Sequence, residues 1–218
     1  MLFNDRDKIV FIGDSITDNG RKRPIGVGLW EGVGNGFVRA IDTLLNVLYP
    51  EKIFSIMNMG IGGHTSADLV KRWQTDALDL KPDCIVCMIG VNDVWRHFDE
   101  PTYLDEHISI DEYAENLQKM VDMSKGVKNF VFVCPYYLEP NKDDLMSKMV
   151  REFAQKMKEV AKKNNILCID VQPDFDEYLK YRHSSYIMWD RVHPGPVGSM
   201  IIARRILKEI GVDKDLLK

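Results

Sequence analysis

Ser15, Asp190 and His193 are residues of the types that together make a serine nucleophile. A serine hydroxyl attacks carbonyl carbon at neutral pH only when an imidazole accepts its proton and a carboxylate orients that imidazole. Asp190 precedes His193 by three residues. One turn can therefore bring the carboxylate to Nδ1 of the ring while Nε2 faces outward. The alternative is a surface aspartate beside a helix-capping histidine, because D-x-x-H pairs are common by chance.

Acyl transfer also needs N–H donors for the negative oxygen of its tetrahedral intermediate. The candidates are the backbone N–H of Ser15, the N–H of Gly63 in NMGIGGHT (58–65) and the side-chain amide of Asn92 in GVND (90–93). Glycines at 62 and 63 let a backbone N–H approach a substrate without a side chain between them. A Gly-Gly or Asn turn alone is usually only a turn, so the hypothesis depends on the whole set.

Other polar residues receive simpler interpretations. Asp14 and Asp93 are rivals to Asp190, but both lie in the turns that carry Ser15 and Asn92, where carboxylates commonly bond loop N–H groups. The run RKR (21–23) is interpreted as a solvated charge run. The remaining histidines lack the spacing of metal ligands, so we expect no catalytic metal and no cofactor: His64, His97, His107 and His183.

The elements that must position these residues alternate along the chain. Strand-like apolar runs occupy 8–13, 53–60, 84–90, 129–135 and 166–171, and stretches with helical spacing occupy 35–48, 66–79, 110–124, 144–163 and 195–210. This alternation predicts an α/β fold, a three-layer sandwich with a five-stranded parallel sheet. The candidate loops then meet at the carboxyl edge of the sheet. Thr65 and the Ser109/Glu112 pair are expected helix caps, and Pro194 is expected at the first position of the last helix.

Composition excludes several kinds of partner. The 218 residues, with a formal charge of −4, fit one domain over 1–218 and carry no basic stripe for nucleic acid. No apolar window approaches a membrane span, and the N-terminus lacks a signal-peptide pattern. All four cysteines lie in apolar strand-like runs, so Cys84 and Cys87 are expected to be core residues rather than a metal or redox pair. A cytoplasmic protein is predicted.

Several aromatic residues adjoin the candidate loops and could contact a sugar ring. We assign substrate contacts to Trp30, Trp95, Arg96, Tyr136 and Trp189, although an aromatic side chain is more often part of the core than a surface for a sugar ring. The glycine-rich segment 20–36 is too irregular for a helix. It is equally consistent with a pocket wall, a subunit contact or a solvated loop.

The blocks GDSIT, NMGIGG, GVND and DRVH, in this order across nearly the whole chain, resemble the SGNH (GDSL-like) hydrolase family. The resemblance implies a flavodoxin-like fold with Ser15 as nucleophile, Asp190 and His193 as acid and base, and Ser15, Gly63 and Asn92 as the oxyanion hole. In many members a serine precedes the oxyanion glycine, whereas this chain has Gly62. A more flexible loop is therefore expected.

Within that family, the segments GDSITDNGRKRPIGVG, GVNDVWR and WDRVHP are similar to bacterial acetylxylan esterases that act on small acetylated xylo-oligosaccharides. The resemblance implies deacetylation of sugar esters and a homo-oligomer in the cytoplasm. A short-chain lipase, a lysophospholipase-like esterase or a thioesterase of the same family is the alternative. A carbohydrate-binding protein that keeps the fold without turnover is a third hypothesis.

Overall fold

The computed structural model describes residues 1–28, 31–99, 107–213 and 215. Its centre is a parallel five-stranded sheet with the strand order β2-β1-β3-β4-β5. The strands are β1 (Lys8–Gly13), β2 (Ser55–Asn58), β3 (Cys84–Met88), β4 (Asn129–Val133) and β5 (Leu167–Ile169). Each lies within an apolar run that predicted it, which confirms the parallel α/β sheet.

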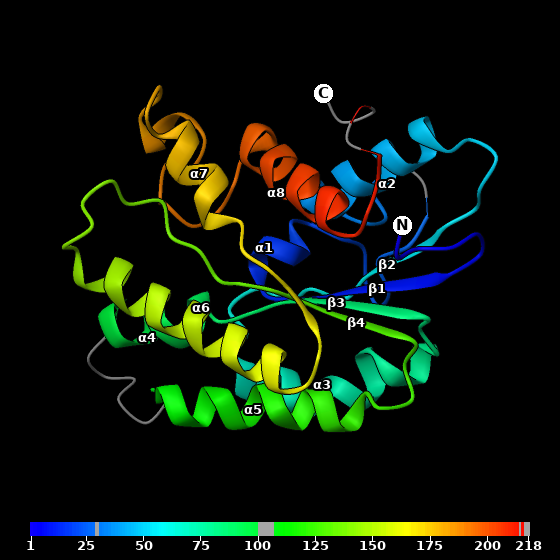
Figure 1. Cartoon of the computed structure of the whole chain (residues 1–218), viewed down its shortest axis with the longest axis horizontal. Coiled ribbons are helices and arrows are strands. Elements are labelled where there is room, and N and C mark those ends of the chain that lie inside the picture. Colours follow the sequence, from blue (N-terminus) through cyan, green and yellow to red (C-terminus); the bar gives the residue numbers. More distant parts are fainter. Residues whose placement is uncertain (29–30, 100–106, 214, 216–218) are drawn as a thin grey trace.

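Helices cover both faces of the sheet, as Figure 1 shows. One face carries α1 (Ser15–Asp18), α2 (Phe37–Leu48), α7 (Gln172–Tyr178) and α8 (Pro196–Glu209), and the other carries α3 (Ser66–Asp76), α4 (Val91–Asp99), α5 (Ile110–Met123) and α6 (Leu145–Lys163). Contacts of α2 with α8, and of α5 with α3 and α6, tie each layer together. The structure is thus the predicted three-layer, flavodoxin-like sandwich.

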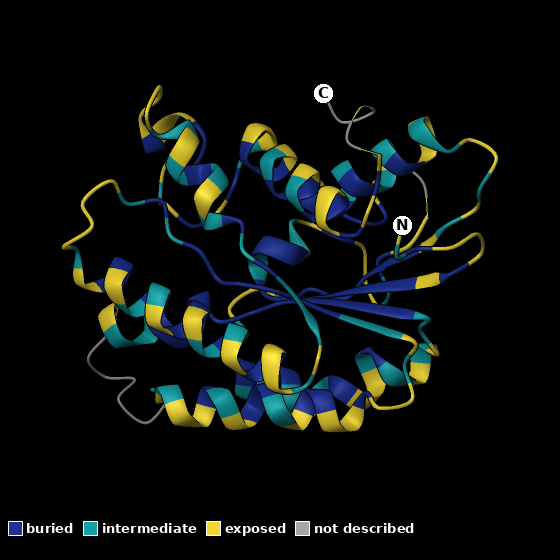
Figure 2. Ribbon diagram, in the orientation of Figure 1, coloured by how far each residue is buried: buried dark blue, intermediate teal, exposed yellow. Residues whose placement is uncertain are grey.

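The core lies between the sheet and these helices. Strand β3 is buried along its whole length and β1 is buried except at Lys8, as the dark blue strands of Figure 2 show. Central strands of a parallel sheet are covered on both faces, which explains their continuous apolar sequence. Cys84 and Cys87 are both buried free thiols, so the core interpretation of the C-x-x-C pair is confirmed.

Local signals predicted the starts of α3 and α5 correctly, but not the start of every helix. Ser109 caps α5 through Glu112, and Thr65 precedes α3 with its N–H donating to Asp68, as expected. The expectation for Pro194 was wrong, because α8 begins two residues later at Pro196 with Gly195 as its N-cap. A proline ring suits either position equally, and the sequence HPGP contains both.

The sheet register brings the candidate loops together. Gly13 at the end of β1 is opposite Met88 at the end of β3, and Phe11 is opposite Asn58 at the end of β2. Helix α1 therefore begins beside the start of α4 and beside the loop that follows β2. No helix within the described ranges has the length and apolar character needed to cross a bilayer.

Candidate active site

Ser15, His193 and Asp190 form one hydrogen-bonded chain. The Oγ of Ser15 lies 2.7 Å from Nε2 of His193, and Nδ1 of the same ring lies 2.6 Å from Oδ2 of Asp190. Ser15 is the first residue of α1, directly after β1, whereas the other two residues precede α8. Residues 178 positions apart in the sequence thus meet at the carboxyl edge of the sheet.

The donor and acceptor properties of these groups determine which atom carries each proton. An ionised carboxylate only accepts hydrogen bonds, so the proton of the neutral imidazole lies on Nδ1 and points to Asp190. The Nε2 lone pair then accepts the hydroxyl hydrogen of Ser15. This is the arrangement in which an imidazole removes the proton of an attacking hydroxyl group.

The short turn between Asp190 and His193 holds the carboxylate in place. Oδ1 of Asp190 accepts the backbone N–H groups of Val192 at 3.0 Å and His193 at 2.8 Å. Partial burial would raise the pKa of Asp190, but the hydrogen bonds from the His193 ring and from these two amides hold it below its ordinary value. Asp190 therefore remains an anion that stabilises a positive imidazole.

Asp14 shapes the turn that presents Ser15. Its Oδ1 accepts the N–H of Ile16 at 2.9 Å and so caps α1, as expected for a carboxylate in this turn. Its Oδ2 is buried without a hydrogen-bond partner among the described residues. Burial raises the pKa of Asp14 to about 7, with the hydrogen bond from Ile16 and the nearby His193 acting in the opposite direction. The carboxylate bonded to the imidazole is therefore that of Asp190 and not that of Asp14.

Asp93 connects two of the loops rather than shaping only its own turn. Both of its carboxylate oxygens accept the N–H of Ser66 at 3.0 Å, and Oδ1 also accepts the Ser66 hydroxyl at 2.5 Å. Burial raises the pKa of Asp93 to about 6, while the bonds from Ser66 lower it. The start of α4 is thereby fixed to the start of α3.

The three N–H groups expected to form the oxyanion hole lie on three segments: the start of α1, the loop after β2 and the start of α4. Gly63 is exposed and has a φ of +80°, a conformation that favours glycine, and its N–H has no acceptor among the described residues. Asn92 is buried at the start of α4 and donates one amide hydrogen to the carbonyl oxygen of His64 at 2.9 Å, which leaves its second amide hydrogen available. The backbone N–H of Ser15, at the first position of α1, is the third donor.

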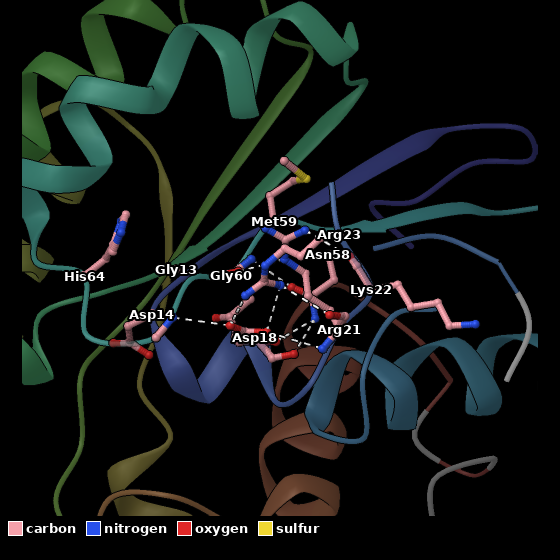
Figure 3. A network of polar contacts seen from close by, with 12 residues as sticks. Gly13, Asp14, Asp18, Arg21, Lys22, Arg23, Asn58, Met59, Gly60 and His64 are labelled. Atoms are coloured by element: carbon pink, nitrogen blue, oxygen red, sulfur yellow. Dashed lines mark hydrogen bonds and ion pairs between the residues drawn. The ribbon is translucent and has the colours of Figure 1, made fainter. Parts of the chain in front are cut away.

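The loop that carries Gly63 is anchored by charged residues that the sequence analysis had not assigned to it. The Oδ2 of Asp18 accepts the N–H of Gly62 at 3.3 Å and forms an ion pair with Arg23 at 2.5 Å. The guanidinium of Arg21 is buried and donates to the carbonyl oxygen of Gly60 at 2.7 Å. Figure 3 shows Asp18 and Arg21 close to Asn58 and Gly60. The interpretation of RKR as a solvated run was therefore wrong for Arg21.

The segment 20–36 is likewise attached to this region over its described part. Gly26 forms an antiparallel bridge with Asn58, and the Asn58 side chain donates to the carbonyl oxygens of Thr17 at 2.6 Å and Val33 at 2.9 Å. These contacts contradict the alternative of a freely solvated loop. Hydrogen bonds from a buried side chain such as Asn58 to backbone carbonyls have no simple sequence signature. The sequence analysis therefore did not predict this attachment.

The residues that were predicted to contact substrate lie in different environments. The ring of Trp95 lies 6.0 Å from that of His193, Arg96 contacts Asp99, and Trp189 is 85% exposed. The assignment of Tyr136 was wrong, because its side chain is fully buried and its hydroxyl donates to the carbonyl oxygen of Val192. Trp30 lies outside the described residues. Among the described side chains, no group of three or more His, Cys, Asp or Glu is placed to hold a metal.

A serine, an imidazole and a carboxylate connected in this order at the edge of a flavodoxin-like sheet define a serine ester hydrolase. The chain belongs to the GDSL-like lipase/acylhydrolase family, whose model matches residues 11–201. Over 98% of its length it is 41% identical to an acetylxylan esterase of Geobacillus stearothermophilus, of which 98% is covered.

Solved structures give the same relationship. The crystal structure of that esterase, Axe2, superposes with a TM-score of 0.95, covering 98% of each chain at 41% identity. Three of its variants, described as catalytic mutants, replace a serine, a histidine and an aspartate by alanine. LAE5, an alpha/beta hydrolase enzyme from the metagenome of Lake Arreo in Spain, matches with a TM-score of 0.93 at 40% identity over 97% of this chain and 98% of its own.

Proposed function

We propose that the chain removes O-acetyl groups from small acetylated xylo-oligosaccharides or similar sugar esters. The observation that carries this proposal is the hydrogen-bonded series from Ser15 through His193 to Asp190. The similarity to an acetylxylan esterase over nearly the full length of both chains supports acetylated xylose units as the substrate class.

The reaction proceeds through an acyl-enzyme intermediate. His193 accepts the hydroxyl proton as Ser15 Oγ attacks the acetyl carbonyl carbon, and Asp190 stabilises the resulting imidazolium. The carbonyl oxygen becomes an oxyanion that receives hydrogen bonds from the N–H groups of Ser15 and Gly63 and from the side chain of Asn92. His193 then protonates the departing sugar oxygen. A water molecule, deprotonated by the same imidazole, attacks the acetyl-serine and releases acetate.

Residues near His193 are the best candidates for holding the sugar. Trp95 is partly buried next to the imidazole, and Trp189, which precedes Asp190, is largely exposed. Flat indole faces suit the apolar faces of sugar rings. Arg96 adds a guanidinium close to Gly63, since a Cβ on that glycine would lie 3.8 Å from its Nη2. These three side chains are proposed substrate contacts.

The organisation of the chain forms the second part of the proposal. One hydrophobic cluster runs from Phe3 to Val212, which supports a single domain over residues 1–218. Three thiols are buried and the fourth is partly buried, which supports a reducing compartment such as the cytoplasm. A homo-oligomer is proposed from the resemblance to bacterial acetylxylan esterases alone. A monomer measured by light scattering would contradict the proposed homo-oligomer.

Acetate release from acetylated xylo-oligosaccharides, together with hydrolysis of p-nitrophenyl esters of increasing chain length, tests the function. We expect activity on acetylated sugars that falls beyond short acyl chains, and a loss of about 10⁶-fold in kcat for Ser15→Ala. A preference for long acyl chains or thioesters would instead favour a lipid esterase or a thioesterase. Retained activity in Ser15→Ala, or no covalent adduct with a serine-directed phosphonate, would contradict the mechanism.

A further inference from the structure

We infer that Arg72 is the positioning residue of the oxyanion hole: its guanidinium fixes the loop that carries Gly63 against the end of β1, two residues before Ser15. This inference rests on the proposed function, because it assumes that Gly63 donates to the oxyanion. Arg72 lies on α3, outside the motifs that contain the reacting groups, and it contacts none of those groups.

The guanidinium of Arg72 spans three segments. Its Nη2 donates to the carbonyl oxygen of Gly13 at 2.8 Å, two residues before Ser15, and its Nη1 donates to that of Met59 at 2.7 Å, just after β2. Its Nε donates to Nδ1 of His64 at 3.1 Å, directly after Gly63. Figure 3 labels these three partners, which lie along the edge where β1 and β2 end.

His64 connects Arg72 to the proposed donors of the oxyanion hole. Its carbonyl oxygen accepts the side-chain amide of Asn92, so one residue is tied to Arg72 through its ring and to Asn92 through its backbone. Gly63 precedes His64, and Gly62 on the other side of Gly63 is bonded to Asp18. The loop is therefore held on both sides of Gly63, through Gly62 and through His64.

The contact requires a neutral His64 with its proton on Nε2, because the Nε–H of Arg72 can only donate. Burial lowers the pKa of His64, and the positive charge of Arg72 lowers it further, although Asp68 and Asp76 act in the opposite direction. The imidazole thus remains an acceptor at neutral pH. The charge of Arg72 is balanced by Asp76 on the same helix, at 2.9 Å.

Arginine is required here for its shape. Its planar fork directs N–H groups along fixed directions to several acceptors, whereas a lysine ammonium is a single compact donor group on a flexible stem. The Arg72 side chain is only 10% exposed, so water cannot readily replace a lost contact. A lysine at this position would leave at least one of the carbonyls of Gly13 and Met59, or the His64 ring, without its donor.

A positioning role for Arg72 predicts a specific kinetic effect. Oxyanion donors act on charge that develops only in the transition state, so a displaced Gly63 N–H lowers kcat more than it changes KM. Arg72→Lys should lower kcat for p-nitrophenyl acetate by about 10- to 100-fold and change KM by less than about 3-fold. Binding of a boronate analogue of the tetrahedral intermediate should weaken by a similar factor.

The matched control is Arg205→Lys. Arg205 is also a largely buried arginine, with ion pairs to Asp174 and Glu209, but it joins α7 to α8 away from the oxyanion loop. We expect its kcat to stay within about 2-fold of wild type. Titration of the active serine with a fluorophosphonate corrects every kcat for the fraction of folded enzyme.

A pair of substitutions at His64 tests the same contact if Arg72→Lys does not fold. Asparagine places an acceptor oxygen near the position of Nδ1, whereas leucine offers none, so His64→Asn should retain most of the kcat that His64→Leu loses. A corrected kcat for Arg72→Lys within 2-fold of wild type, or equal losses in the two His64 variants, would overturn the inference. Ser15→Ala separates the outcomes, since activity retained in that variant would remove the proposed function itself.

Discussion

Tyr136 donates its hydroxyl hydrogen to the carbonyl oxygen of Val192 over 2.9 Å, from the segment after β4 to the turn that carries Asp190 and His193. The N–H of Leu138 bonds to the carbonyl oxygen of Arg191 at 3.0 Å in the same region. The Tyr136 ring packs on Phe175, with centroids 4.8 Å apart. A buried tyrosine thus anchors the turn that aligns the imidazole.

Tyr136→Phe should keep the packing and remove only this hydrogen bond. Because the Val192 carbonyl then loses its donor in a buried site, the free energy of unfolding should fall by about 1 to 2 kcal/mol. We also expect a several-fold decrease in kcat, because the imidazole is oriented less well. Urea unfolding and steady-state kinetics measure the two effects. An unchanged unfolding midpoint would show that the hydroxyl is not an anchor.

Asp190→Asn should leave the fold intact and lower kcat by roughly 10⁴-fold. Asparagine can still accept the N–H groups of Val192 and His193 through its oxygen, but it does not stabilise the imidazolium and it permits the wrong tautomer. Circular dichroism and esterase kinetics are the measurements. A loss of less than about tenfold would indicate that Ser15 and His193 act as a dyad or that Asp14 replaces Asp190.

The two glycines of the oxyanion loop should respond differently to substitution. A Cβ at Gly62 would lie 3.8 Å from Cβ of Ser15, an ordinary contact, so Gly62→Ser should be tolerated, with kcat within about 3-fold of wild type. Gly63 has a φ of +80°, so Gly63→Ala should cost about 1 kcal/mol or more of stability and lower kcat further than Gly62→Ser. Thermal unfolding and kinetics of both variants compare the positions, and equal effects would contradict the assignment.

The raised pKa of Asp14 predicts a pH dependence of stability. Burial raises this pKa from 3.8 to about 7, so between these values the folded protein retains a proton that the unfolded chain has lost. The free energy of unfolding therefore falls as the pH rises from 4 to 7, by up to about 1.4 kcal/mol per pH unit from this group.

Asp14→Asn keeps an oxygen for the Ile16 N–H and removes the ionisation. Urea unfolding at pH 4, 5.5 and 7 should show that the variant loses less stability than wild type over this range. Asp93, whose pKa is also raised by burial, remains in both proteins and contributes equally to them. Parallel curves for the two proteins would mean that Asp14 is ionised throughout.

The strands and the longer helices were predictable because their signals are local. Runs such as KIVFIG and CIVCMIG are apolar at every position, as strands covered on both faces must be, and the Ser109/Glu112 box acts within one turn. The segment GVND was expected to be a loop, yet α4 begins at Val91. The buried pair Val91 and Val94 shows the helical spacing, but Val94 lies outside the motif, so the motif alone was interpreted as a turn.

The sequence by itself determined which residues have the chemistry of a serine esterase, because residue type and spacing around Ser15, Asn92 and the pair Asp190/His193 are local properties. Only the tertiary structure decided how these groups are held. The burial of Tyr136 and Arg21 and the three-way contact of Arg72 join segments that are distant in the sequence. Every residue has a backbone carbonyl that can accept a hydrogen bond from a distant side chain. The residue type of the acceptor therefore does not indicate the bond, and no sequence pattern could have predicted it.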